Sequence, residues 1–195
     1  DDEPAIICTS HTPALTAING HLWLAFKGHN NPSIWIVALR ERAAGIYELR
    51  RYGRLNHAET RRGPSMAGPT ADPIAHVGVS KPPMVVYRGN SDPSVWLHSY
   101  MHSDHDLRLS ETRSAFAPAT AYDELRSQEA RYVAYTDRAG QQVMFMHDFR
   151  PGRVGMPPGW SAPEPVPYAF TPRRPAMAVL DNVVWLAIKS RNTDD

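Results

Sequence analysis

The sequence is poor in cysteine, in lysine and in long apolar segments, and each shortage excludes a class of protein. The single cysteine, Cys8, excludes an intramolecular disulfide and a cysteine-rich zinc site. No run of about 18 apolar residues is present, so we expect no membrane span. The 21 basic residues, only three of them lysines, are balanced by 20 acidic residues, which argues against nucleic acid as the main partner. No signal-peptide pattern is seen, and the compartment, secreted or cytoplasmic, stays open.

Long helical patterns are lacking as well. Eighteen prolines and twelve glycines are spread through the chain, and only residues 43–49 and 122–130 could form a helical turn or two. Short strands between frequent turns are typical of a sandwich, a barrel or a propeller. We therefore expect an all-β fold in a single domain that covers residues 1–195.

One segment recurs along the chain, and it is the main evidence for the fold. Residues 22–38 align without a gap on residues 83–99, which places Gly28 on Gly89. A third copy covers residues 131–147, and a fourth begins at Val184. In these copies both sets of alternate residues are largely apolar, as expected of a strand that is covered on both faces. The repeat therefore predicts equivalent middle strands in successive sheets.

Another strand precedes each copy at a nearly fixed distance. We place the starts of the four units at Pro13, Pro73, near Asp123 and Pro175. Asn19-Gly20 and Asp181-Asn182 lie between the first two strands of their units and are typical of two-residue hairpin turns. Each unit then contains a strand, a tight hairpin, a strand, a turn, a strand and a longer tail that can hold a fourth strand.

Sheets of this size cannot bury both faces alone, so neighbouring units must stack on one another. Radial stacking predicts a small β-propeller of about four blades. The last blade is incomplete, because no match to residues 34–38 follows the fourth copy. Residues 3–10 could complete this blade and close the ring. They could instead be the outer strand of a preceding unit, since residues 3–13 resemble residues 164–175. A truncated chain or an oligomeric ring would explain the deficit equally well.

Residues 13–28, which read PALTAINGHLWLAFKG, resemble the repeat of lectin-like and sialidase-like β-propellers from bacteria and fungi, PxLxxFNGxLYLAWKG. Residues 159–163, GWSAP, resemble the outer-strand element of the same group. The resemblance implies a propeller fold and a glycan ligand. The sialidase turn, SxDxGxTW, has only a partial echo at residues 91–96, which lack its glycine. The four-bladed hemopexin type is a rival architecture, matched only in part by residues 26–28.

Aromatic and basic residues recur at equivalent positions of the repeat. An aromatic ring beside a cation suits a sugar, whose C–H groups stack on the ring while its hydroxyls accept charge-assisted hydrogen bonds. The alternative is that the aromatics pack between blades and the cations cover the rim. The candidate ligand-binding residues are Trp23, Lys27, Trp35, Arg88, Trp96, Trp185 and Lys189.

Residues 98–106 contain three histidines and two aspartates, and His102, Asp104 and His105 are weak candidates for a metal site. The alternative is a solvated loop. The sequence contains no serine nucleophile elbow, no zinc-protease helix motif and no glycine loop that could cradle a phosphate. We therefore expect a protein that is not an enzyme and needs no cofactor.

The first functional hypothesis is a non-catalytic, lectin-like propeller with repeated shallow sites for glycans or glycoproteins. The alternative is a protein-binding module, such as a protease inhibitor, a toxin component or a scaffold, that would use residues 40–70 and 150–167 as long loops. A glycosidase comes third. A homo-oligomer is compatible with each of the three.

Overall fold

The computed structural model describes residues 8–18, 20–68, 83–99, 106–125, 128–151 and 159–190. The predicted all-β class is confirmed, because these residues form fourteen strands and no helix. Among them no helix is long and apolar enough to cross a membrane.

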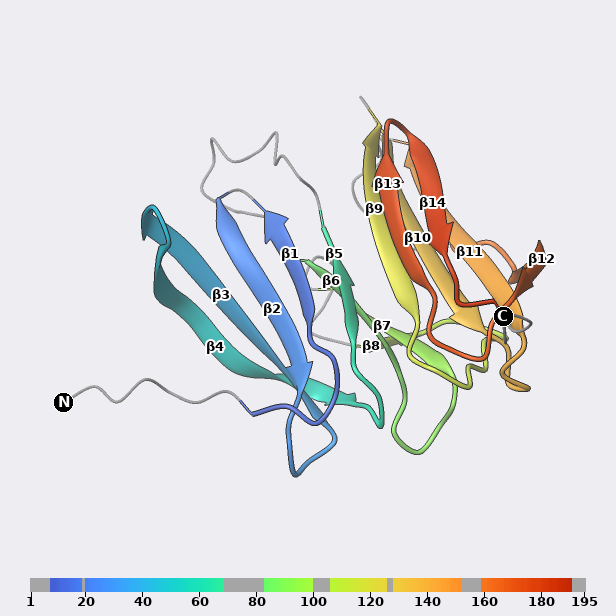
Figure 1. Cartoon of the computed structure of the whole chain (residues 1–195), viewed down its shortest axis with the longest axis horizontal. Coiled ribbons are helices and arrows are strands. Elements are labelled where there is room, and N and C mark those ends of the chain that lie inside the picture. Colours follow the sequence, from blue (N-terminus) through green and yellow to red (C-terminus); the bar gives the residue numbers. More distant parts are fainter. Residues whose placement is uncertain are drawn as a thin grey trace.

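Four antiparallel sheets follow one another along the chain, and in each of them the strands are neighbours in sequence order (Figure 1). Sheet 1 consists of β1 (Ala14–Ile18), β2 (His21–Lys27), β3 (Ser33–Ala43) and β4 (Ile46–Glu59). Sheet 2 consists of β5 (Ser65–Ala67), β6 (Met84–Arg88), β7 (Val95–Ser99) and β8 (Asp106–Arg108). Sheet 3 consists of β9 (Ala119–Leu125), β10 (Gln128–Thr136), β11 (Gln142–Pro151) and β12 (Glu164–Phe170). The C-terminal hairpin consists of β13 (Ala176–Leu180) and β14 (Val183–Ala187).

The four segments predicted as middle strands are β2, β6, β10 and β14, and each is the second strand of its sheet. The helical turns predicted at residues 43–49 and 122–130 are wrong, since the described parts of both segments belong to the hairpins β3–β4 and β9–β10. Residues 40–70 are equally not a long loop, because they contain the end of β3 and all of β4 and β5. Cross-strand pairing with an already formed neighbour outweighs the weak local preference for helix.

The first strands agree with the prediction in three units out of four. β1, β9 and β13 lie at or near the predicted starts, but the strand that pairs with β6 is Ser65–Ala67. The predicted start at Pro73 lies outside the described residues. The connection from β5 to β6 is therefore much longer than the two-residue turn of β13–β14, in which Asp181 and Asn182 have φ of 52° and 60°.

Short linkers of one pattern lead into the first strand of every sheet. A threonine or serine stands four residues before a proline, and the strand begins directly after the proline. The pairs are Thr9 and Pro13, Thr60 and Pro64, Ser114 and Pro118, and Thr171 and Pro175. Each hydroxyl shares a hydrogen bond of 2.8–3.2 Å with the main chain two residues later, which fixes the turn.

The cores lie between successive sheets. We call the side of a sheet that packs on the next sheet along the chain its forward face, and the opposite side its rear face. In the first core, Ile18, Trp23 and Ile36 of the forward face of sheet 1 pack with Val85 and Tyr87 of the rear face of sheet 2. The same relation joins sheet 2 to sheet 3, and sheet 3 to the C-terminal hairpin. Strands with two apolar faces follow from this arrangement.

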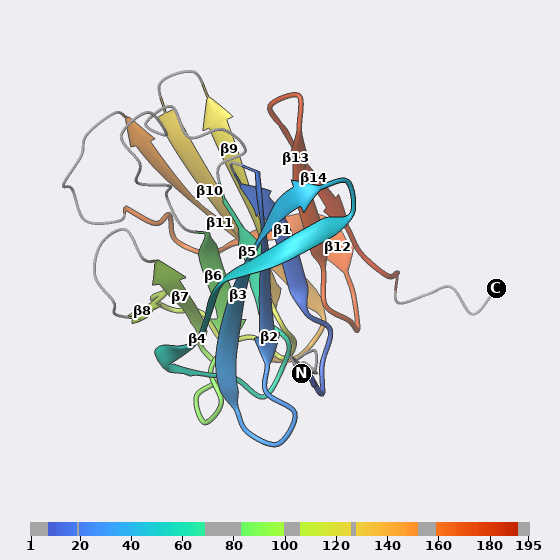
Figure 2. The same cartoon turned by 90° about the vertical axis from the view of Figure 1, so that its left-hand side faces the viewer.

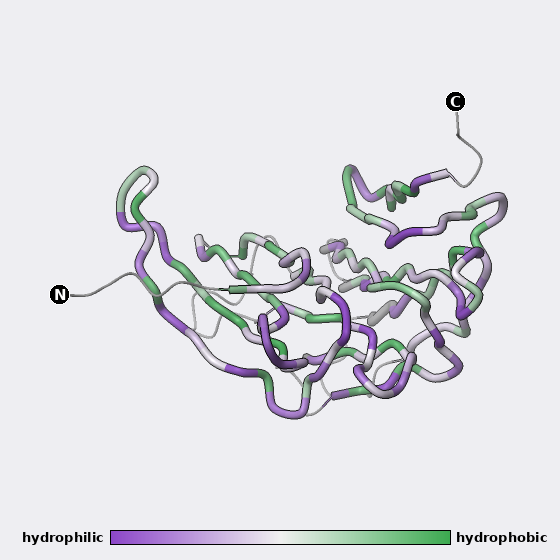
Figure 3. The backbone as a smooth tube through the Cα atoms, turned by 60° about the horizontal axis from the view of Figure 1, so that its bottom comes forward, coloured by the Kyte–Doolittle hydropathy of each residue, from purple (hydrophilic) through white to green (hydrophobic). Residues whose placement is uncertain are grey.

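The first strands of the sheets lie against one another in chain order: β5 contacts β1 and β9, and β9 contacts β13. The Thr120 N–H donates to Ser65 Oγ at 3.0 Å, and Arg174 Nη2 donates to the Pro64 carbonyl at 3.1 Å, so that linkers and first strands of different sheets are joined. The described residues form an open arc and no closed ring, with sheet 1 at one end and the C-terminal hairpin at the other (Figures 1 and 3). Figure 2 looks onto the arc from the side of sheet 1.

Candidate functional site

The predicted tryptophan ligands do not converge on one site. Trp23 is buried in the core between sheets 1 and 2, whereas its equivalent in the repeat, Trp185, lies exposed on the C-terminal hairpin. Trp35 stacks on Tyr52 with 5.2 Å between the ring centroids. Trp96 lines one of the two cavities described below, where it also packs against the first core. Trp23 therefore fits the alternative that aromatics pack between blades.

The predicted cations lie on the rim and bond mainly to protein groups. Lys27 Nζ donates to Ser10 Oγ at 2.9 Å and to the Gly28 carbonyl at 3.0 Å. Arg88 Nε donates to the Ser114 carbonyl at 2.6 Å, and burial, with the neighbouring arginines as a second cause, lowers the pKa of Arg88. Lys189 is exposed. The donors of Lys27 and Arg88 therefore connect strands to linkers.

The weak metal candidates His102, Asp104 and His105 lie outside the described residues. Within the part of the chain that the structure describes, no group of three or more histidine, cysteine, aspartate or glutamate side chains could hold a metal ion.

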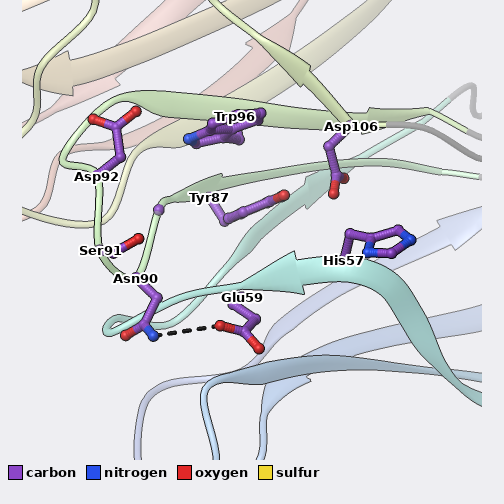
Figure 4. Close-up of a pocket in the computed structure, with 9 residues that line it drawn as sticks. His57, Glu59, Tyr87, Asn90, Ser91, Asp92, Trp96 and Asp106 are labelled. Carbon is purple, nitrogen blue, oxygen red and sulfur yellow. Dashed lines mark hydrogen bonds between the residues drawn. The ribbon is translucent and has the colours of Figure 1, made fainter.

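One cavity lies between the outer strand of sheet 1 and the last three strands of sheet 2, and we call it cleft 1. It has a volume of about 390 Å³. In Figure 4 the side chains of His57 and Glu59 come from β4, and those of Tyr87, Trp96 and Asp106 come from sheet 2 across from them. The turn between β6 and β7 completes the lining with Gly89, Asn90, Ser91 and Asp92.

One wall of cleft 1 is a buried polar cluster. His98 is fully buried on β7, and its Nδ1 lies 2.9 Å from Oδ1 of Asp106, its cross-strand partner on β8. Burial raises the pKa of the neighbouring Tyr87, and the charge of Asp106 and a hydrogen bond to Asp106 raise it further. The Tyr87 hydroxyl therefore stays neutral and donates to the Asp106 carboxylate. The same carboxylate also holds His98 in place.

The opposite wall carries the accessible polar groups. Glu59 is exposed at the end of β4, and its Oε2 accepts a 3.4 Å hydrogen bond from Asn90 Nδ2 across the cleft. His57 has φ of 60°, a left-handed conformation that is rare for residues other than glycine. This kink lies where the pairing of β3 with β4 shifts register, between Ser33 and Trp35. The irregular end of β4 places His57 and Glu59 at the cleft.

Asp92 belongs to the structure of the turn. Its Oδ1 accepts hydrogen bonds from the N–H and the hydroxyl of Ser94 at 3.1 and 2.9 Å, and its Oδ2 lies 3.3 Å from Arg108 Nε. Burial acts to raise the pKa of Asp92, but the bonds from Ser94 and the charge of Arg108 prevail and lower it. Asn31 takes the same place in sheet 1, where Oδ1 accepts from the Ser33 N–H at 3.1 Å.

A second cavity, cleft 2, occupies the corresponding place between sheets 2 and 3. Its volume is about 320 Å³, and its lining includes Glu111 and Leu109 beyond β8, together with Met146 and Trp160 of the sheet 3 region. Glu111 has φ of 58° and lies three residues before the linker hydroxyl of Ser114, as His57 does before Thr60. Trp160 Nε1 is buried without a hydrogen-bond partner among the described residues.

Most residues of the clefts were missed by sequence reasoning, although the linker pattern was a signal for them. Residues with left-handed φ lie three positions before the linker hydroxyl in all three complete sheets: His57, Glu111 and Tyr168. The threonine or serine four residues before a proline would have located these positions. It would also have placed the start of the second unit at Pro64 instead of Pro73.

Comparison with family models, with curated proteins and with solved structures finds no match to this chain.

Proposed function

We propose that this protein is a non-catalytic carbohydrate-binding module whose sheets are blades of a β-propeller and whose sugar sites are the clefts between neighbouring blades. The observation that carries the proposal is cleft 1, where an indole, a phenol, exposed carboxylate oxygens and a side-chain amide line one cavity of about 390 Å³. The repeat predicts binding residues at equivalent positions of successive sheets, and one of them, Trp96, lies at the junction of sheets 1 and 2. We therefore place the sugar sites at such junctions.

The chemistry of cleft 1 suits a sugar better than an apolar or an anionic ligand. The partly exposed indole of Trp96 offers a surface on which the C–H groups of a pyranose can stack. Glu59 and Asn90 offer acceptors and donors for hydroxyl groups, and bonds to an ionised carboxylate are the stronger ones. The carboxylates of Glu59, Asp92 and Asp106 disfavour an anionic ligand.

The repetition of the clefts adds a second line of support. Cleft 2 also pairs a tryptophan with the residue of left-handed φ that precedes a linker. The Nε1–H of Trp160, which has no partner among the described residues, would donate a hydrogen bond to a ligand hydroxyl oxygen. Two weak sites on one chain bind a branched or surface-displayed glycan more tightly than either site alone.

The propeller arrangement is supported by the order of packing. Three four-stranded meanders and a hairpin follow one another, and each forward face packs on the next rear face. The first strands contact each other in the same order, as expected of strands that surround a common axis.

A glycan array followed by calorimetry with the best-bound sugar tests the proposal. We expect Trp96→Ala to weaken binding about tenfold, since an aromatic contact of this kind contributes about 1 kcal/mol. Glu59→Gln should weaken binding as well, and this variant keeps an exposed side chain of the same size. Trp35→Ala is the matched control, because Trp35 holds the position of Trp96 in sheet 1 without lining either cleft.

Absence of any bound glycan for a folded sample, or equal affinity of the Trp96 and Trp35 variants, would contradict the sugar site. Circular dichroism confirms the fold of each variant. Hydrolysis of a reporter glycoside that Glu59→Gln abolishes would contradict the non-catalytic assignment.

Protein binding is the second candidate, and the surface of β4 favours it. This strand exposes four large apolar side chains, Ile46, Tyr47, Leu49 and Tyr52, beside Arg50 and Arg51. Scattered exposed apolar residues are common, but such a group on one strand is typical of a contact surface. Capture of a stoichiometric protein partner that free sugars do not displace, and that Tyr52→Ser releases, would favour this candidate.

A further inference from the structure

The forward face of the C-terminal hairpin is exposed although its counterpart in sheet 1 is buried. The hairpin aligns on β1 and β2 without a gap, so that Trp185 corresponds to Trp23 and Leu180 to Ile18. Trp23 is 6% exposed and Trp185 60%, and Ile18 is 1% exposed whereas Leu180 is 62%. Sheet 2 covers the forward face of sheet 1, but none of the described residues covers that of the hairpin.

The rear face of sheet 1 is exposed at its first strand, although Phe26 and Val37 farther along the same face are buried. Leu15 of β1 is 59% exposed. Its equivalents are Met66 in sheet 2, which is buried in the first core, and Met177 in the hairpin, which packs against sheet 3. First strands thus bury their rear face wherever a sheet precedes them in the described chain, and β1 is the exception.

The two exposed faces are therefore the two halves of an interface that the chain already forms between its own sheets. Alternate residues on both are apolar and uncharged, so that their contact would desolvate no charge. On the hairpin these residues are Ala176, Ala178, Leu180, Val183, Trp185 and Ala187, and on sheet 1 they are Leu15, Ala17, Leu22 and Leu24.

We infer that the forward face of the hairpin in one chain docks on the rear face of sheet 1 in a second copy, in the manner in which sheet 1 docks on sheet 2. Sheet 1 and the C-terminal hairpin lie at opposite ends of the open arc, which favours contact between copies over contact within one chain (Figure 1). Trp185, Leu180 and Leu15 supply the free energy of association, because the contact removes their large apolar side chains from water. Such an interface is head-to-tail, so that it propagates until a ring closes.

Two charge substitutions at exposed positions test the inference. Wild-type chain should give an oligomer in light scattering coupled to gel filtration, with a mass that is a multiple of 21.8 kDa. Trp185→Glu and Leu15→Glu should each give a monomer, since each places a charge in the interface. An equimolar mixture of these two variants should form a 1:1 dimer, because each retains the face that the other has lost.

The mixture of the Trp185→Glu and Leu15→Glu variants distinguishes contact between the hairpin and sheet 1 from contact between two hairpins or two sheets 1. Phe170→Glu, at an exposed apolar position of sheet 3 outside both faces, is the control and should leave the oligomer intact. A wild-type chain that is monomeric throughout would overturn the inference, as would a Leu15→Glu variant that still associates alone through hairpin-to-hairpin contact. The readout is mass, so that the result does not depend on whether any glycan binds.

Discussion

At the scale of single residues, the turn between the second and third strands of a sheet is built by one side-chain oxygen. Asn31 in sheet 1 and Asp92 in sheet 2 both accept a hydrogen bond from the N–H of the serine two residues later. The amide and the carboxylate are interchangeable for this bond, but only Asp92 adds an ion pair, with Arg108. Comparing the two turns therefore distinguishes the stabilisation that comes from the charge of Asp92 from the stabilisation that comes from the hydrogen bond.

Asp92→Asn should keep the fold and lose the contribution of the charge. The pKa of Asp92 is lowered in the folded protein, so its stabilisation is complete above the ordinary value of 3.8 and disappears as the pH falls through the lower folded value. At neutral pH we expect the variant to be less stable by no more than about 1 kcal/mol, since the pair is partly exposed. Urea unfolding at pH 7 and at about pH 2.5 measures this.

The difference in unfolding free energy between the variant and the wild type should be smaller at the acidic pH than at pH 7. A difference of the same size at both values would mean that the charge is not its source. Asn31→Asp is the reverse substitution and keeps the same hydrogen bond to Ser33, so it checks that the turn accepts either side chain.

At the scale of strands and sheets, the sequence predicted the second strands well and the outer strands poorly. Residues 22–38 and 83–99 align because their second strands carry apolar residues on both faces, and this leaves a strong pattern; β6 is the one that a sheet covers on each side. β4 is covered on few of its positions, so its exposed residues follow no such pattern. Cleft 1 lies against this strand, and for that reason only Trp96 of its lining was among the predicted ligands.

The C-terminal hairpin is the element whose stability depends most on one neighbour. A two-stranded hairpin is marginally stable alone, and β13–β14 is held by the packing of Met177 and Leu186 against sheet 3. Leu186→Ala should therefore speed amide exchange of β13 and β14 roughly 5- to 30-fold, as expected for the loss of about 1–2 kcal/mol at a partly buried site.

Hydrogen exchange read by mass spectrometry measures this effect segment by segment. Exchange of β10, in the middle of sheet 3, should not change in the Leu186 variant. Leu180→Ala is the matched control, because Leu180 is on the exposed face of the same hairpin. The comparison is made at a protein concentration at which the chain is monomeric. Equal acceleration by both substitutions would contradict the assigned packing.

At the scale of the whole molecule, every junction between successive sheets has an apolar core, but the junctions differ in whether a cleft forms beside that core. A cleft forms where the preceding sheet supplies an outer strand and the following sheet supplies its third and fourth strands. The junctions of sheets 1 and 2 and of sheets 2 and 3 meet both conditions, and they hold clefts 1 and 2. The junction of sheet 3 with the two-stranded C-terminal hairpin meets only the first condition.

The proposed contact between copies meets only the second condition, because the hairpin brings no outer strand to sheet 1 in the described chain. Self-association should therefore strengthen binding to a multivalent glycan surface without creating a further site. Calorimetry with a monovalent sugar should give the same number of sites, at most two per chain, for the wild type and for monomeric Leu15→Glu. On a glycan-coated surface the wild type should bind more tightly, since linked sites raise the effective concentration. A greater number of sites in the wild type would mean that residues outside the two clefts bind sugar at the junction between copies.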